Sequence, residues 1–277
     1  MKVCFKINIV ISLTNLKTII MKKVSLLFVL FISFAVSAQS VINNTYLDVP
    51  ANEIGDFLQL HKKVVDMSNG EGRTINIHWV YRHWYGSDHS IMLADIYPTV
   101  EVAVKDDFWG VLNANIEKLS ENDKKEMQSV VKKWWSYWNN HTDEIRSVDW
   151  DNNWIGKENI NLDIPYVFVV GSYNSNAGNQ DLIDAYMDWN VKPGVEKGVM
   201  LYGGATSHNI GSGSDVQLWS AYTDIAEFAV SNGPNGQVNS EFAPKFWSLV
   251  EGAHNDQIYI HAGHTINKEF NFAGKDN

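Results

Sequence analysis

The chain has 277 residues, of which 45% are hydrophobic and 19% charged, proportions typical of a folded globular protein rather than a disordered one. Its formal net charge of −10 excludes strong binding to nucleic-acid phosphates, which proteins neutralise with lysine and arginine. The single cysteine, Cys4, excludes a disulfide framework and a cysteine-rich zinc site.

The first 38 residues are typical of an export signal. Two lysines precede an apolar run, Val24–Phe34, and small residues end the segment at Ala38. The apolar run is short for a transmembrane helix, so cleavage after Ala38 is favoured over a membrane anchor. We therefore expect residues 1–38 to be a signal peptide, in which 1–20 is an over-extended start. The mature protein is then exported, periplasmic or secreted, with no membrane attachment after cleavage.

Hydrophobic periodicity predicts four strands and several helical segments between residues 41 and 150. Apolar residues alternate in the strands and recur every three to four residues in the helices. In chain order these are a strand at 45–49, a helix at 51–67, strands at 74–84 and 90–96, a helix from Pro98 toward Asp107, a helix capped by Ser120, and a strand at 145–148.

The same signals predict a similar series in the second half of the chain. They give a strand at 166–171, a helix at 180–189, strands at 198–205 and 216–221, a helix from Asp224 to Asn232, a helix at 241–251 and a strand at 257–261. Residues 150–161 form a connector rich in Asp, Asn and Trp, and the residues after Lys268 are expected to be a mobile tail.

Segments of the two halves match in the same order along the chain. His83-Trp84-Tyr85-Gly86-Ser87 aligns with His208-Asn209-Ile210-Gly211-Ser212. His141-Thr142-Asp143-Glu144-Ile145 aligns with His254-Asn255-Asp256-Gln257-Ile258. We interpret the matches as a tandem duplication. Its parts are a first repeat at 41–150, a linker at 151–163, a second repeat at 164–266 and a tail at 267–277.

Each half predicts the order β-α-β-β-α-β, the ferredoxin-like unit. Two such units in one chain resemble the dimeric α+β barrel superfamily, which includes antibiotic-biosynthesis monooxygenases, EthD-like proteins and the NIPSNAP group. The resemblance implies an α+β fold in which two tandem ferredoxin-like units pair their sheets into one barrel within the chain, with helices outside. It also implies a ligand between helices and sheet or inside each half.

Two pairs of residues recur at matching positions and are candidate catalytic groups. His83 and His208 end the first strand of each hairpin, where an imidazole is either a general base or a support for the turn. Tyr97 and Tyr222 follow the second strand, where a phenol either donates to a developing oxyanion or packs its ring. Tyr81 is the alternative acid–base partner of His83.

The strand before the first hairpin carries the richest set of binding-type side chains. Even-numbered residues from 78 to 84 share one face and odd-numbered residues share the other. Arg82 is suited to a bidentate contact with a carboxylate. The matching strand of the second half carries small side chains, and Gly203 and Gly204 are expected to line a wider pocket. This asymmetry between the halves favours one working site over two, or reflects simple divergence. The predicted substrate-binding residues are His78, Trp79, Arg82, Trp84 and Tyr202.

Other clusters are interpreted as structural. The two His-x-Asp motifs, at 141–143 and 254–256, offer two metal ligands each, and a His-x-x-His at 261–264 offers two more. No metal site is predicted from them. In the connector, Trp150 and Trp154 either form a stacking surface for a planar ligand or fold into the core.

The residues favour an exported small-molecule enzyme of the α+β barrel type that uses a His/Tyr acid–base pair. The alternative is a non-catalytic ligand-binding protein for haem, an aromatic metabolite or a glycan fragment, and a third option is a fold kept for protein–protein contact. No cofactor is predicted, with haem left open. The expected partner is a small molecule, with no nucleic acid, and the expected state is a monomer or weak homodimer.

Overall fold

The computed structural model describes residues 40–274 of the chain, apart from 87–88, 159, 234–239 and 267. The predicted signal peptide at 1–38 lies outside these residues, and its role stays a prediction. In the part of the chain that the structure describes, no helix is both long enough and apolar enough to cross a membrane.

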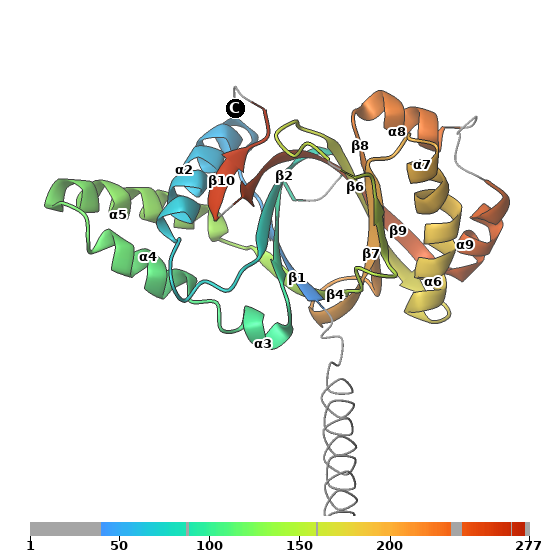
Figure 1. Ribbon diagram of the computed structural model, residues 1–277, viewed down its shortest axis with the longest axis horizontal. Helices are drawn as coiled ribbons and strands as arrows, with labels where there is room; N and C mark the ends of the chain where they lie inside the picture. Colours follow the sequence, from blue (N-terminus) through green and yellow to red (C-terminus); the bar gives the residue numbers. More distant parts are fainter. Residues whose placement is uncertain (1–39, 87–88, 159, 234–239, 267, 275–277) are drawn as a thin grey trace, which may run out of the picture. The chain divides into compact units, whose positions relative to one another are not determined.

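Eight antiparallel strands form a closed barrel (Figure 1). Their order around the barrel is β9-β2-β3-β1-β4-β7-β8-β6, and β6 pairs back onto β9. The strands are β1 (Ser40–Leu47), β2 (Ile77–Tyr85), β3 (Ile91–Tyr97), β4 (Thr142–Val148), β6 (Val167–Ser175), β7 (Tyr202–Gly211), β8 (Val216–Tyr222) and β9 (Val250–Ile266). Two short strands lie outside this ring: β5 (Trp154–Gly156) pairs with β7, and β10 (Glu269–Phe272) pairs with β9.

The long strand β9 closes the barrel, because its first part pairs with β6 and its later part pairs with β2. The strands at 40–148 lie in the order β4-β1-β3-β2, and those at 167–266 lie in the order β9-β6-β8-β7. The two sets meet where β4 pairs with β7 and where β9 pairs with β2. A mixed α+β barrel, as the resemblance implied, is therefore confirmed.

Helices cover the outer face of each set of strands (Figure 1). The first set carries α2 (Ile54–Met67), α3 (Val100–Ala103), α4 (Phe108–Ile116) and α5 (Glu121–Trp135). The second carries α6 (Asn179–Tyr186), α7 (Lys192–Glu196), α8 (Ile225–Asn232) and α9 (Ala243–Leu249). Single turns of 3₁₀ helix lie at Ala51–Glu53, Ser136–Trp138 and Ser240–Phe242, and a π-helical turn lies at Met187–Val191.

Strand alternation divides the hydrophobic residues into three cores. One core fills the barrel, with Tyr81, Phe168 and Trp219 among its buried residues. The other two lie between each helical layer and the outer face of the strands, around Phe57 in the first half and Phe246 in the second. Neighbouring residues of one strand therefore face different compartments.

Four expectations about secondary structure are corrected. The helix expected from Pro98 is two helices, α3 and α4, because Asp107 caps the second through the amide of Gly110 at 3.0 Å. Part of the Trp-rich connector pairs with β7 as β5. The helix expected at 241–251 ends at Leu249, and β9 starts at Val250, well before the expected strand at 257–261.

The expected mobile tail is also wrong for residues 269–272, which form strand β10. Phe270 is fully buried in the core beneath α2, and its backbone amide donates to Asp66 of that helix at 2.8 Å. Gly263 makes room for the ring, since a Cβ there would overlap it. The signal missed from sequence is the alternation of two phenylalanines, Phe270 and Phe272, with polar residues in this short segment.

We predict that Phe270→Ala lowers the free energy of unfolding by about 3–5 kcal/mol, because it leaves a cavity beneath α2. Urea denaturation of the purified protein measures the change. Phe272→Ala, at a half-buried position of the same strand, is the matched control and should cost clearly less. Equal small losses in the two variants would contradict the docking of β10.

Candidate functional site

A cavity of about 380 Å³ lies between the first helical layer and the outer face of β1, β2 and β3. We call it the helix–sheet cleft. One side is formed by strand residues that point away from the barrel, among them His78, Asp95 and Tyr97. The other side is a wall of aromatic rings from α4, α5 and the turn after α5: Phe108, Trp109, Trp134, Trp135 and Trp138. The rings contact one another, with centroids of Trp134 and Trp138 4.9 Å apart.

A chain of buried polar groups crosses this cleft. His61 of α2 and His78 of β2 approach at 2.7 Å between their Nε2 atoms. Nδ1 of His78 lies 2.5 Å from Oδ1 of Asp95 on β3, and Nε1 of Trp134 donates to Nδ1 of His61 at 3.0 Å. Both imidazoles are buried, while the Asp95 side chain is 25% exposed. The carboxylate is thus the accessible end of the chain.

The indole fixes which nitrogen of each imidazole carries a proton. An indole N–H only donates, so Nδ1 of His61 must accept and its proton lies on Nε2. That proton is donated to Nε2 of His78, whose own proton therefore lies on Nδ1 and is donated to Asp95. Burial, and secondly the nearby His78, lowers the pKa of His61 well below its usual value, so His61 stays uncharged.

A second polar cluster lies at another part of the cleft. Arg73 donates through Nε to both carboxylate oxygens of Asp106 at 3.0 Å, and it lies over the ring of Phe108, 5.0 Å from the centroid. The hydroxyl of Tyr97 lies 3.5 Å from Asp106. Burial, and then the carboxylates of Asp95 and Asp106, raise the pKa of Tyr97, so its hydroxyl keeps its proton and can donate it in a hydrogen bond.

The first His-x-Asp motif borders the same cleft. Nε2 of His141 lies 3.0 Å from Asp143, which also accepts from the hydroxyl of Thr45 at 2.5 Å. Nδ1 of His141 lies 2.7 Å from the carbonyl of Trp138. The motif therefore ties β4 to the turn after α5 and holds one side of the aromatic wall.

The second helical layer covers a larger cavity of about 710 Å³, lined by Tyr173, His254 and Asp256 among others. The His254 and Asp256 side chains approach at 3.1 Å, as in the first half. The offset that aligns His83 with His208 places Gly203 opposite His78 and Ser220 opposite Asp95. This second cleft therefore lacks the imidazole–carboxylate chain.

The structure brings only some of the sequence-predicted site residues together. Tyr97 and His78 line the helix–sheet cleft, whereas Trp79, Tyr81 and Tyr202 point into the barrel. Arg82 and Trp84 are exposed, and register shifts follow Val80 and His83, so the simple alternation expected for this strand is interrupted. His83, Arg82 and Tyr97 do not line one cavity.

The remaining predicted residues have local contacts. His83 lies edge-to-face against Tyr259, and Nε2 of His208 lies 3.1 Å from the carbonyl of Gly211 in its hairpin. Tyr222 is fully buried and accepts from Asn232 at 3.0 Å. Gly203 and Gly204 do not line an open pocket, because Val191 packs on the first and Trp219 on the second.

The residues that sequence reasoning missed are His61, Asp95, Arg73 and Asp106. His61 had a signal: it lies on the apolar stripe of α2, between Leu58 and Val65 at helical spacing. Asp95 follows the alternation of β3 onto the helix-facing side. Their meeting across the cleft is a tertiary contact, which periodicity does not encode.

Haem does not fit the imidazoles of this cleft. His61, His78 and His141 each use both ring nitrogens in contacts with neighbouring protein groups, so an axial ligand would have to break one. His261 and His264 have buried ring nitrogens without a partner, but Tyr166 stacks on the first and the two imidazoles stack on each other. Among the described residues, no group of three or more His, Cys, Asp or Glu is arranged to hold a metal ion.

Comparison with known proteins supports the fold. No family model matches the sequence, and no curated protein is similar to it in sequence. An anthrone oxidase-like protein superposes with a TM-score of 0.54 at 10% identity, over 83% of this chain and 94% of its own. A monooxygenase-like protein from Fusobacterium nucleatum gives 0.54 at 10% identity, over 81% and 94%.

A chlorite dismutase-like protein gives a TM-score of 0.41 at 10% identity, over 81% of this chain and 94% of its own. The two higher-scoring neighbours are α+β barrel proteins, so the structural comparison shows a shared barrel fold.

We predict that acid destabilises the protein partly through His61. The unfolded chain takes up a proton at the ordinary pKa of 6.5, whereas the folded imidazole stays neutral. The free energy of unfolding therefore falls below about pH 6.5, by up to about 1.4 kcal/mol per pH unit for this group. Urea denaturation between pH 7 and pH 4 measures the slope.

His61→Leu should reduce that slope, even though it lowers stability at every pH. Val64→Ala, a buried substitution in the same helix, removes no titrating group and is the matched control. It should keep the wild-type slope. A wild-type slope in His61→Leu would contradict the assignment of a neutral His61.

Proposed function

We propose that the helix–sheet cleft is the active site of a small-molecule enzyme that removes a proton from a planar aromatic substrate. The observation that carries the proposal is the chain from His61 through His78 to Asp95, which ends in a partly exposed carboxylate beside a wall of indole rings. A proton acceptor and a stacking surface therefore share one cavity.

The aromatic wall supports the choice of substrate. Offset and edge-to-face contacts between rings favour a planar molecule over a flexible one. Contacts within the wall hold its rings in place, since Trp134 is buried and Trp135 stacks on Trp138 with ring centroids 5.5 Å apart. A substrate ring on this wall would face the strand residues that carry the polar groups.

In this proposal Asp95 accepts the substrate proton. His78 is a positioning residue, because its N–H holds one oxygen of the carboxylate, and His61 in turn prevents the His78 ring from turning. Tyr97 keeps its proton, and its hydroxyl would turn from Asp106, 3.5 Å away, to donate to negative charge that develops on the substrate. General-base catalysis of this kind typically contributes a factor of 10²–10⁴.

We further propose that the overall reaction is an oxygenation. A substrate CH₂ group that has lost a proton can be oxidised by dioxygen, so that one oxygen atom remains on the carbon as a carbonyl and the other leaves as water. Support comes from the type of fold, which this chain shares with anthrone oxidase-like and monooxygenase-like proteins.

The His83–Tyr97 acid–base pair stays a prediction. In the mechanism proposed here the imidazole that acts at the site is His78 rather than His83. Three further expectations are also proposals: that the two halves arose by tandem duplication, that the protein is exported after cleavage near Ala38, and that it is a monomer or weak homodimer. The matching strand order of the two halves supports the first.

Asp95→Asn should lower kcat for a planar probe substrate, anthrone, by about 10²–10⁴-fold, because the amide keeps the contact with His78 but cannot accept a proton. Dioxygen consumption and the absorbance of the quinone product measure turnover. Asp256→Asn, in the cleft of the second half, is the matched control and should leave kcat within about threefold of wild type.

Wild-type turnover in Asp95→Asn, or an equal loss in both variants, would contradict the assignment of the base. If the wild-type protein bound anthrone without any uptake of dioxygen, the oxygenation part of the proposal would be wrong.

A further inference from the structure

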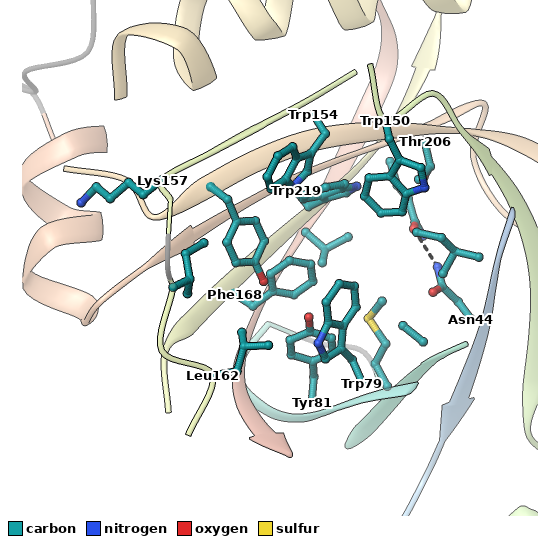
Figure 2. A pocket seen from close by; sticks show the side chains of 17 residues that line it. Asn44, Trp79, Tyr81, Trp150, Trp154, Lys157, Leu162, Phe168, Thr206 and Trp219 are labelled. Carbon is teal, nitrogen blue, oxygen red and sulfur yellow. Dashed lines mark hydrogen bonds between the residues drawn. The ribbon is translucent and has the colours of Figure 1, made fainter. Parts of the chain in front are cut away.

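The barrel interior holds a further cavity of about 220 Å³, on the opposite face of the sheet from the helix–sheet cleft. Its wall is mostly apolar and includes four indoles, Trp79, Trp150, Trp154 and Trp219 (Figure 2). The indoles of the connector fold inward over the barrel strands. Lys157 is the charged residue of this wall; its ammonium projects away from the rings and donates to the carbonyl of Gly198 at 2.7 Å.

Two polar atoms in this wall are buried without a hydrogen-bond partner: Oδ1 of Asn44 and Nε1 of Trp79. Asn44 is only 3% exposed. Buried polar atoms in folded proteins nearly always have a partner, since an unpaired one costs about 1–3 kcal/mol. One hydrogen-bond acceptor and one hydrogen-bond donor are therefore unpaired in the wall of this mostly apolar cavity.

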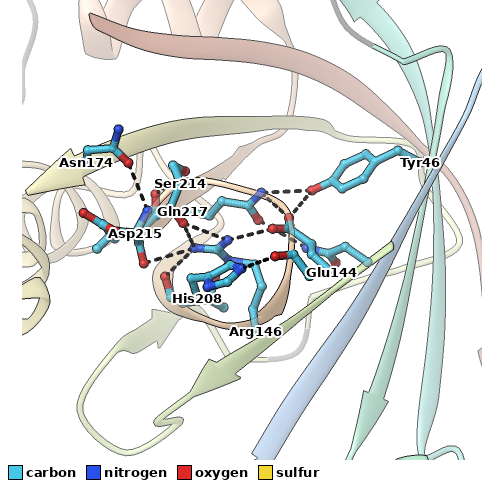
Figure 3. A network of polar contacts seen from close by, with 12 residues as sticks. Tyr46, Glu144, Arg146, Asn174, His208, Ser214, Asp215 and Gln217 are labelled. Atoms are coloured by element: carbon cyan, nitrogen blue, oxygen red, sulfur yellow. Dashed lines mark hydrogen bonds and ion pairs between the residues drawn. The ribbon is translucent and has the colours of Figure 1, made fainter. Parts of the chain in front are cut away.

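The polar network around Glu144, Arg146 and Gln217 is shown in Figure 3. It fixes the orientation of the Asn44 amide through Gln217. Fully buried Arg146 donates to one oxygen of Glu144 at 2.8 Å. The other Glu144 oxygen accepts from Nε2 of Gln217 at 2.6 Å and from the hydroxyl of Tyr46 at 2.8 Å. The carbonyl oxygen of Gln217 must then face Asn44, whose Nδ2 donates to it at 3.2 Å.

Turning the Asn44 amide over would bring its carbonyl oxygen against that of Gln217, so the unpaired atom is the acceptor Oδ1. The network that contains the Glu144–Arg146 pair therefore presents a fixed acceptor to the cavity. Burial, and then the Glu144 charge, raise the pKa of Tyr46, so the Tyr46 hydroxyl keeps its proton at neutral pH.

We propose that the barrel interior is a second ligand site, separate from the helix–sheet cleft, for an uncharged planar aromatic molecule with a hydroxyl group. The ring lies among the indoles, the hydroxyl donates to Oδ1 of Asn44, and an oxygen of the ligand accepts from Nε1 of Trp79. An anion is disfavoured because the ammonium of Lys157 points away from the rings and the Arg146 charge is balanced by Glu144.

Methionine methyl groups distinguish the two cavities. Met92 lines the barrel cavity, whereas Met67 and Met127 belong to the core on the helical side. In protein labelled with ¹³C at the methionine methyls, titration with 2-naphthol should shift the Met92 signal saturably. 2-Methoxynaphthalene, which keeps the ring and an oxygen but lacks the donor, should bind at least about tenfold more weakly, as expected for one lost buried hydrogen bond.

Ala94→Leu places a larger side chain in the barrel cavity and should abolish the Met92 response. Trp79→Phe keeps an aromatic ring, removes the N–H donor and should weaken 2-naphthol binding several-fold. This variant tests the site independently if Ala94→Leu fails to fold. Trp135→Ala alters the wall of the helix–sheet cleft and should leave the Met92 response unchanged.

The proposal is overturned if 2-naphthol shifts Met67 and Met127 but not Met92, if no signal shifts saturably, if the two naphthalenes bind equally, or if Ala94→Leu binds like wild type. These readouts use binding alone. Failure of Asp95→Asn to reduce turnover would therefore leave this site untouched, and absence of the barrel site would leave the proposed active site untouched.

Discussion

Closure of the barrel is the constraint on which every site in this protein depends. Strand β9 pairs with β6 on one side and β2 on the other, so the ring is closed and buried side chains that alternate along its strands face either the interior or a helical layer. His78 and Trp79 are neighbours in sequence, yet one belongs to the proposed active site and the other to the proposed barrel site. A shift of register by one residue would exchange them.

The same closure explains why the two halves differ in chemistry while sharing a strand order. Gly203 and Gly204 leave room for Val191 and Trp219, whereas the matching positions of the first half hold His78 and Trp79. The buried Glu144–Arg146 pair is a further asymmetry. Such a pair stabilises little compared with apolar packing, but here it orients Gln217 and Asn44, so we interpret it as a device for fixing polar geometry.

Sequence patterns predicted the barrel because it rests on local signals. Alternation along 74–84, the apolar stripe of α2 and the ordered matches between halves each appear in the chain itself. The site was predicted only in part, at His78 and Tyr97. His61 and Asp95 lie 17 residues on either side of His78, and only packing of α2 on the sheet brings all three together. Phe270 was missed for the same reason, since its burial depends on Gly263 and α2.

The most direct test of the account is the protonation pattern of the histidine rings, read from long-range ¹H–¹⁵N correlation spectra at pH 7. The account predicts an uncharged His61 with its proton on Nε2, and a proton on Nδ1 of His78, as the Trp134 N–H requires. A proton on Nδ1 of His61, or a His61 that becomes charged near pH 6.5, would contradict the buried chain that ends at Asp95.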